Sequence, residues 1–142
     1  MSMTLTIIKP DAVAAGNTGN ILAKLEESGF TIRCLRKLRL SEEQAKAFYE
    51  VHKERPFYGE LVKFMTSGPV VPAVLEKDGD DAVPALREVM GATNSKEAAE
   101  GTIRNLYGTD IEQNAIHGSD SDENAAIEMA FFFSRTERLG AC

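Results

Sequence analysis

A histidine followed by small polar residues is the most chemically suggestive feature of the sequence. His117 precedes Gly118–Ser121, and Asn114 lies three residues before it. Gly118 would leave room beside the imidazole, and the serines and aspartate that follow are typical of helix N-caps. A helix start there would direct free N–H groups and a positive dipole end towards His117. That field suits a phosphate and favours the neutral, nucleophilic imidazole. A turn histidine that only packs is the alternative on this motif alone.

The usual phosphate-binding and metal-binding signatures are absent from the sequence. It contains neither GxxxxGK[ST] nor GxGxxG, which argues against a P-loop and a Rossmann dinucleotide site. It has two histidines, so a zinc site built on several histidines is not expected. The second, His52, lies among charged residues and is explained by a solvated face or a helix C-terminus.

Composition limits the classes of protein to consider. The 142 residues are 43% apolar and 27% charged, which predicts one globular domain over residues 1–142. The formal net charge is −6, so nucleic acid is not expected as a partner, and phosphates must be held by a few placed cations. Cys34 and Cys142 cannot form a disulfide framework, and the sequence shows neither a membrane span nor a secretory leader. We therefore expect a cytoplasmic protein with no membrane partner.

The first half of the chain alternates strand and helix patterns. Thr4–Ile8 reads as a strand, a helix over Ile21–Leu25 is expected to stop at Gly29, and Phe30–Leu40 alternates apolar and basic residues as a strand does. A capping box at Ser41 and Gln44 predicts a helix from residue 41 to about Lys53.

The second half continues that alternation. A short helix over Gly59–Met65 is followed by a buried strand at Val70–Leu75, where Pro72 favours an edge strand or a local break. We expect an acidic turn at residues 77–81, helices at residues 82–90 and 95–100, and a mostly irregular segment over 101–115. Residues 121–133 predict a helix that gives way to a fourth strand at Met129–Phe133. The order predicts an α/β fold in the form of an α+β sandwich. Its centre is a ferredoxin-like four-stranded antiparallel sheet covered by helices.

Six motifs, in order and at compatible spacing, resemble those of nucleoside diphosphate kinases over nearly the whole chain. They are Thr6–Ala12, Arg55–Tyr58, Ser67–Val70, Met90–Asn94, Gly101–Arg104 and Asn114–Ser121. Enzymes of that family transfer the terminal phosphate of a nucleoside triphosphate to a nucleoside diphosphate. The resemblance implies a ping-pong route through a phosphohistidine at His117, with Nδ1 as the attacking atom.

The resemblance also implies a role for each further site residue. Arg87, Arg104 and Thr93 would contact the phosphates, and Lys9 both the sugar hydroxyl and the transferred phosphate. Asn114 would contact the ribose 3′-hydroxyl, and Tyr49 the phosphate or His117. Ser119 and Glu128 would orient His117. Phe57 would stack on the base, with Leu61 and Ile111 beside it. Since stacking needs only a π face, broad base tolerance is expected. Mg²⁺ is implied as a cation that arrives bound to the nucleotide phosphates.

The departures from the family pattern concern assembly. Ser95 stands where the family usually has proline, Glu100 stands where eukaryotic members often have it, and the turn at residues 77–81 is about two residues longer than usual. The family self-associates, and both a homotetramer and a homohexamer stay open. A non-catalytic nucleotide-binding subunit and a hydrolase that uses the same histidine are the alternatives. The presence of His117, Arg87, Arg104 and Lys9 argues against the first.

Overall fold

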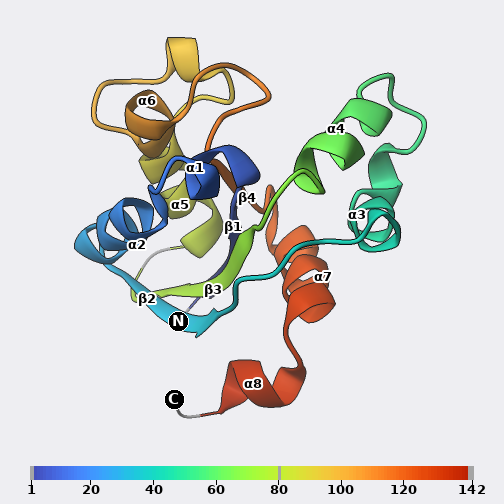
Figure 1. The fold of residues 1–142 in the computed structure, drawn as a ribbon. Coiled ribbons are helices and arrows are strands. Elements are labelled where there is room, and N and C mark those ends of the chain that lie inside the picture. Colours follow the sequence, from blue (N-terminus) through green and yellow to red (C-terminus); the bar gives the residue numbers. More distant parts are fainter. Residues whose placement is uncertain (1, 80, 141–142) are drawn as a thin grey trace.

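A four-stranded antiparallel sheet forms the centre of the molecule. The computed structural model describes residues 2–79 and 81–140, so Asp80 of the predicted acidic turn and Cys142 lie outside the described residues. The strands are β1 (Ser2–Ile8), β2 (Phe30–Leu35), β3 (Val71–Lys77) and β4 (Ile116–Gly118). Their spatial order is β2-β3-β1-β4 (Figure 1). This order confirms the predicted ferredoxin-like sheet.

Eight α-helices and two 3₁₀ turns, η1 and η2, are found among the described residues. In chain order they are α1 (Pro10–Ala14), α2 (Thr18–Glu27), α3 (Glu42–Phe48), η1 (Glu50–His52), α4 (Tyr58–Met65), α5 (Ala82–Met90), η2 (Ser95–Glu97), α6 (Ile103–Tyr107), α7 (Asp122–Phe132) and α8 (Arg135–Leu139). None of these helices has the length and apolar character needed to cross a membrane.

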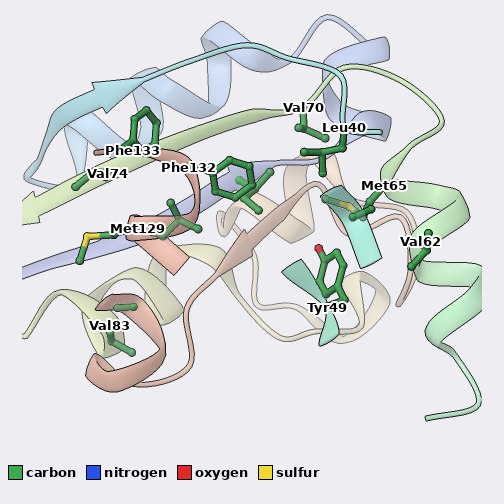
Figure 2. Packing of buried hydrophobic residues seen from close by; sticks show 14 residues of the cluster. Leu40, Tyr49, Val62, Met65, Val70, Val74, Val83, Met129, Phe132 and Phe133 are labelled. Atoms are coloured by element: carbon green, nitrogen blue, oxygen red, sulfur yellow. The ribbon is translucent and has the colours of Figure 1, made fainter. Parts of the chain in front are cut away.

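Each face of the sheet is covered by its own set of helices and has its own core. Helices α3, α4 and α7 cover one face, and Tyr49, Met65, Met129 and Phe132 are packed there (Figure 2). Helices α1, α2, α5 and α6 cover the other face. Side chains alternate along β1, so Leu5 and Ile7 belong to the first core while Ile8 belongs to the second. The sheet is therefore the middle layer of a three-layer molecule (Figure 1).

The prediction of the fourth strand was wrong. Met129–Phe133 is not a strand, because α7 continues to Phe132, and the fourth strand is the three residues around His117. The apolar run at 129–133 arises from helix packing. Met129 and Phe132 lie in the core, while Phe131 on the other side of the helix is 41% exposed. A three-residue strand is too short to show an alternating pattern.

Pro72 does not mark an edge strand, since β3 pairs with β1 on one side and β2 on the other. The carbonyl of Pro72 accepts a hydrogen bond from the Arg36 N–H at 3.1 Å. In an antiparallel strand the nitrogen of a residue faces the same side as its carbonyl, so the missing donor of Pro72 faces β2. Since β2 ends at Leu35, the proline costs the sheet little there.

The predicted strand at 30–40 is interrupted. A bulge between Ile32 and Cys34 shifts the register against β3, so Ile32 packs on one face of the sheet and Cys34 on the other. Beyond β2, Leu38 forms an isolated bridge with Val70. The single inward face predicted from the alternation is therefore divided between the two cores.

The remaining predicted elements differ mainly at their ends. The capping box at Ser41 and Gln44 is confirmed, although α3 ends at Phe48 and a 3₁₀ turn follows. The segment 101–115 was predicted as irregular but contains α6, which Thr102 caps by accepting a hydrogen bond from the Asn105 N–H. Helices α1 and α8 were not predicted, because each has only five residues.

Candidate functional site

Strand β4 positions the imidazole of His117. His117 pairs with Ile7 of β1, so its side chain lies on the face of the sheet covered by α3, α4 and α7. The Thr6 hydroxyl donates a hydrogen bond to the His117 carbonyl oxygen at 2.8 Å and fixes the backbone there. The imidazole is 23% exposed. It is therefore held on a short edge strand while part of the ring reaches solvent.

A carboxylate on α7 holds one nitrogen of this ring. Glu128 Oε1 lies 2.8 Å from His117 Nε2 and accepts a hydrogen bond from the Ser119 hydroxyl at 2.7 Å. An ionised carboxylate only accepts, so the pairing assigns the imidazole proton to Nε2 and leaves the lone pair on Nδ1. Helix α7 thus acts on His117 through Glu128 in its second turn.

Lys9 and Asn114 form a second, buried polar group. The Lys9 ammonium donates to Asn114 Oδ1 at 2.8 Å and to the Glu112 carbonyl at 3.1 Å. The Asn114 amide donates to the carbonyls of Thr93 and Ile111. Burial lowers the pKa of Lys9 to about 8, with Asp11 and other carboxylates partly opposing that shift. The Thr93 side chain is exposed and adjoins this group through its backbone.

Two arginines extend the positive charge of the site. Arg104 of α6 is buried and donates to the Ile116 carbonyl at 2.8 Å and to the Gly91 carbonyl at 3.1 Å. Burial, with a smaller effect from the charge of Arg87, lowers the pKa of Arg104 to about 10. Arg87 of α5 is exposed. Lys9 and Arg104 also act on each other electrostatically, so Lys9, Arg87 and Arg104 form one connected group.

Aromatic residues line the α3–α4 side. Tyr49 is buried, and burial together with the charge of Glu128 raises the pKa of its phenol, which stays a donor at neutral pH. The His52 ring lies between Tyr49, at 6.5 Å, and Phe57, at 5.6 Å between centroids. Phe57 is 48% exposed. His52 is therefore half-buried between two aromatic rings, and not a purely solvated residue.

The other two predicted base-flanking residues lie apart in the structure. Leu61 is half-buried against the first core, whereas Ile111 is 64% exposed in the loop that precedes Asn114. Ile111 meets the site through its carbonyl, which accepts from the Asn114 amide. The described contacts do not join Leu61, Ile111 and Phe57 into one preformed pocket.

The sequence reasoning missed Phe48 and misjudged Gly118. The Phe48 ring packs edge-on against the His117 imidazole, with centroids 5.7 Å apart and planes at 76°. The only sequence signal for Phe48 was an apolar position on a helix. A side chain on Gly118 would meet Met90 Sδ at 2.6 Å and Leu86 Cδ2 at 3.0 Å. Gly118 therefore permits the close approach of α5, and the predicted space for a partner is filled by this helix.

No group of three or more histidine, cysteine or acidic residues that could hold a metal ion is found in residues 2–79 and 81–140. Lys9, Arg87 and Arg104 form one group of cations, in which Asp11, Glu112 and Asp110 also act on Lys9, while Glu128 pairs with His117. Such a set suits an anionic ligand that carries its own cation.

Comparisons with known proteins show which family this chain is similar to. Residues 2–138 match the family model described as "Nucleoside diphosphate kinase". The nucleoside diphosphate kinase of Methylobacterium sp. (strain 4-46) is 60% identical over 137 residues, which covers 96% of each chain. That of Campylobacter fetus subsp. fetus is 61% identical and covers 96% of this chain and 98% of its own.

Solved structures agree with the sequence comparison. The nucleoside diphosphate kinase of Aquifex aeolicus is 50% identical and superposes with a TM-score of 0.92, covering 96% of this chain and 97% of its own. A halophilic enzyme from Halobacterium salinarum, solved in complex with CDP, is 40% identical with a TM-score of 0.91, covering 99% of this chain and 93% of its own.

Proposed function

The chain belongs to the nucleoside diphosphate kinase family, and from this premise we propose that it moves a phosphoryl group in two steps through His117. As a nucleoside diphosphate kinase it transfers phosphate between nucleotides. The proposal adds the ping-pong route, the phosphohistidine, the roles of the individual residues and the tolerance for different bases.

The pairing of His117 Nε2 with Glu128 carries the proposal. Glu128 Oε1 lies 2.8 Å from Nε2, and Ser119 holds the same oxygen at 2.7 Å. With the proton on Nε2, the lone pair of Nδ1 is available for attack. The edge-on contact with Phe48 limits rotation of the ring. A nucleophile fixed in this way loses little entropy on reaching the transition state.

The two half-reactions balance. In the first, the Nδ1 lone pair forms a bond with the γ-phosphorus, the bond to the bridging oxygen breaks, and that electron pair leaves with the nucleoside diphosphate. In the second, a terminal oxygen of another nucleoside diphosphate attacks the phosphorus and Nδ1 recovers its pair. Positive charge on Nδ1 in the intermediate is offset through Nε2 by Glu128.

The cations stabilise the charge that develops on the transferring phosphate. Arg87 and Arg104 supply guanidinium donors to its oxygens, and Lys9 supplies a compact charge. Thr93 donates its hydroxyl. Tyr49, whose pKa burial raises, donates its phenol to the phosphate or to His117. Mg²⁺ enters as part of the substrate, bound to the nucleotide phosphates, and neutralises them further.

Nucleoside recognition uses few directional contacts. Phe57 offers an exposed ring for stacking, with Leu61 and Ile111 beside the base, and every base has a π face. Lys9 and Asn114 contact the ribose 3′-hydroxyl. Their mutual hydrogen bond at 2.8 Å supports this role, because it fixes both groups before the ligand arrives. CDP bound to the Halobacterium salinarum relative supports acceptance of a pyrimidine base.

We also propose the setting in which the enzyme works. Residues 1–142 form a single domain of the cytoplasm, and the chain self-associates into a homotetramer or a homohexamer. Strand β2 lies at an edge of the sheet, with Leu35 48% exposed, and Ile127 on α7 is 63% exposed. An edge strand and exposed apolar side chains support association between copies.

Phosphorylation of the protein by nucleotide tests the mechanism. We expect incubation with labelled ATP and Mg²⁺ to give a phosphoprotein that is acid-labile and base-stable, as a phosphohistidine is. His117→Ala should give none, while His52→Ala should label as the wild type does. Equal labelling of wild type and His117→Ala contradicts the proposal.

A chase with a second nucleotide separates the kinase from a hydrolase. Unlabelled GDP added to the purified phosphoprotein should carry the label into GTP, and CDP and UDP should do the same. Release of the label as free phosphate at the same rate without an acceptor would instead establish hydrolysis.

A further inference from the structure

A strained turn immediately precedes the strand that carries His117. Ala115 has φ of +72°, and it is the one non-glycine residue with positive φ in the described part of the chain. The Ile116 N–H donates to the Asn114 carbonyl across it at 2.8 Å. A three-residue turn of this kind with positive φ is rare, because the Cβ of a non-glycine residue crowds the backbone. Such a conformation persists only where its surroundings enforce it.

This turn joins the two polar groups of the site. On its N-terminal side Asn114 is bound to Lys9, and on its C-terminal side Ile116 begins β4, which positions His117. Any relaxation of Ala115 would rotate one group relative to the other. Ala115 is fully buried, so the turn cannot adjust towards solvent.

Asp11 holds one side of the turn. Its carboxylate Oδ2 accepts a hydrogen bond from the Ala115 N–H at 3.1 Å, and the Ala115 carbonyl accepts from the Lys9 N–H at 2.9 Å. Both backbone groups of Ala115 are therefore bound by the segment that follows β1. Asp11 lies in the first turn of α1, which begins at Pro10, so its backbone is itself constrained.

Burial, backbone hydrogen bonds and the charge of Lys9 all act on the Asp11 carboxylate. The side chain is partly buried, and burial raises its pKa while the Ala115 hydrogen bond and the charge of Lys9 oppose that rise. Asp11 and Lys9 therefore stabilise each other electrostatically while each holds a different part of the 112–115 segment. The contact spans 104 positions in the sequence, and local structure alone does not supply it.

We propose that Asp11 is a positioning residue, which clamps the strained turn at Ala115 and so sets His117 against the nucleotide-binding pair Lys9–Asn114. The proposal rests on the proposed role of His117 as the nucleophile. Asp11 makes no hydrogen bond to His117 among the described residues, and it acts through the backbone of Ala115. Its removal should slow the chemical step more than it weakens nucleotide binding.

Rapid-mixing measurement of His117 phosphorylation by ATP tests this in four variants. Asp11→Ala should be slower by about 10²-fold, as expected for a displaced reacting group. Asp11→Asn keeps an acceptor for the Ala115 N–H and should lose no more than about tenfold. Glycine adopts positive φ without strain, so a turn with Ala115→Gly should depend less on Asp11. Asp11→Ala should therefore slow phosphorylation by a smaller factor in the Ala115→Gly background than in the wild type.

Controls keep the result separate from folding and from the proposed function. Glu43→Ala removes an exposed acidic residue from the first turn of α3 and should react as the wild type does. Amide hydrogen exchange at Ala115, followed by NMR, should be faster in Asp11→Ala than in Asp11→Asn whether or not His117 is phosphorylated. The clamp would be overturned if Asp11→Ala left the phosphorylation rate unchanged, or if it slowed phosphorylation by the same factor with and without Ala115→Gly. Unchanged amide exchange at Ala115 would also overturn it. Absence of phosphorylation in the wild type, with faster exchange in Asp11→Ala, would instead remove His117 as the nucleophile and leave the clamp intact.

Discussion

Single residues supply positive charge at the site of a chain whose formal net charge is −6. Lys9 and Arg104 are buried, and Arg87 acts on Arg104 from an exposed position. Burial weakens the screening of a charge by water, so each of these cations interacts with a phosphate more strongly than it would at the surface. Burial also lowers the pKa of Lys9 to about 8, which makes its charge sensitive to pH.

We predict that kcat/KM falls above about pH 8, where Lys9 loses its proton. Asp11, Glu112 and Asp110 raise this pKa and Arg104 lowers it, but desolvation is the largest effect. Activity is therefore high below the pKa, where the ammonium is charged, and is lost as the pH rises through it. A pH–rate profile checks this. In Lys9→Arg the guanidinium stays charged, so the alkaline fall should move to higher pH; an unmoved fall would assign it to another group.

Phe57 should contribute to binding of every nucleotide to a similar degree. We predict that Phe57→Ala weakens the affinity for ADP, GDP, CDP and UDP by about 1–3 kcal/mol each, through loss of base stacking. Titration calorimetry of the four diphosphates measures this. Val51→Ala, a change at a side chain that is 84% exposed on the neighbouring 3₁₀ turn, serves as the control. Affinities unchanged in Phe57→Ala would remove Phe57 from the base site.

The sequence predicted several single residues of the candidate site. His117 was singled out from its residue types, whereas Lys9 and Asn114 came from the resemblance to the family, and the structure brings Lys9 and Asn114 into direct contact. Phe48 could not be identified, because an apolar residue on an amphipathic helix has the same signal whether it packs on a core residue or on an imidazole. Its role depends on how α3 docks.

The helices and strands that position these residues differ in how well the sequence predicted them. Helix α5 spans Ala82–Met90 as predicted, since its apolar spacing and its stop at Gly91 are both local signals. Strand β4 and helix α6 have three and five residues, and local signals of that length are too weak to read. Tertiary pairing with β1 decides that residues 116–118 are a strand.

The capping box at the start of α3 should stabilise the element that carries Phe48. Ser41 Oγ accepts from the Gln44 N–H at 3.1 Å, and Gln44 Oε1 accepts from the Ser41 N–H at 2.9 Å. We predict that Ser41→Ala lowers the free energy of unfolding by about 1 kcal/mol. Urea unfolding at a fixed chain concentration measures it. Ser134→Ala, in the matching box of α8, is the comparison, and no loss in either variant would show that these caps contribute nothing.

At the scale of the molecule, a sheet with a core on each face gives the site its rigidity. Helices α3, α4 and α7 meet around Phe48 and Phe132 on one face, whereas α5 and α6 hold Arg87 and Arg104 on the other (Figure 1). Arg104 reaches from one layer to the carbonyl of Ile116, the residue before His117, and acts electrostatically on Lys9, whereas the His117 side chain faces the other layer. Their relative placement depends on both cores.

Loss of packing in the first core should destabilise the whole molecule. Leu5 of β1 is fully buried, so we predict that Leu5→Ala lowers the free energy of unfolding by about 2–5 kcal/mol. Leu139→Ala removes the same atoms from a side chain that is 64% exposed and should change stability by less than about 0.5 kcal/mol. Chemical unfolding of both variants at equal concentration compares them. Equal losses would contradict the assigned burial.

The sequence by itself indicated the family, through the order of its six motifs, and the fold class and the helices with long periodic patterns, through residue type and spacing. The roles of the residues proposed around His117 came from the resemblance to that family and stay predictions. Tertiary structure alone decided which nitrogen of His117 is held by Glu128, which strand carries it, and how Asp11 supports Ala115. Each of these is a contact between residues distant along the chain, except that of Glu128. That contact spans eleven positions and depends on how α7 packs across β4. Such contacts arise only when the two cores have packed.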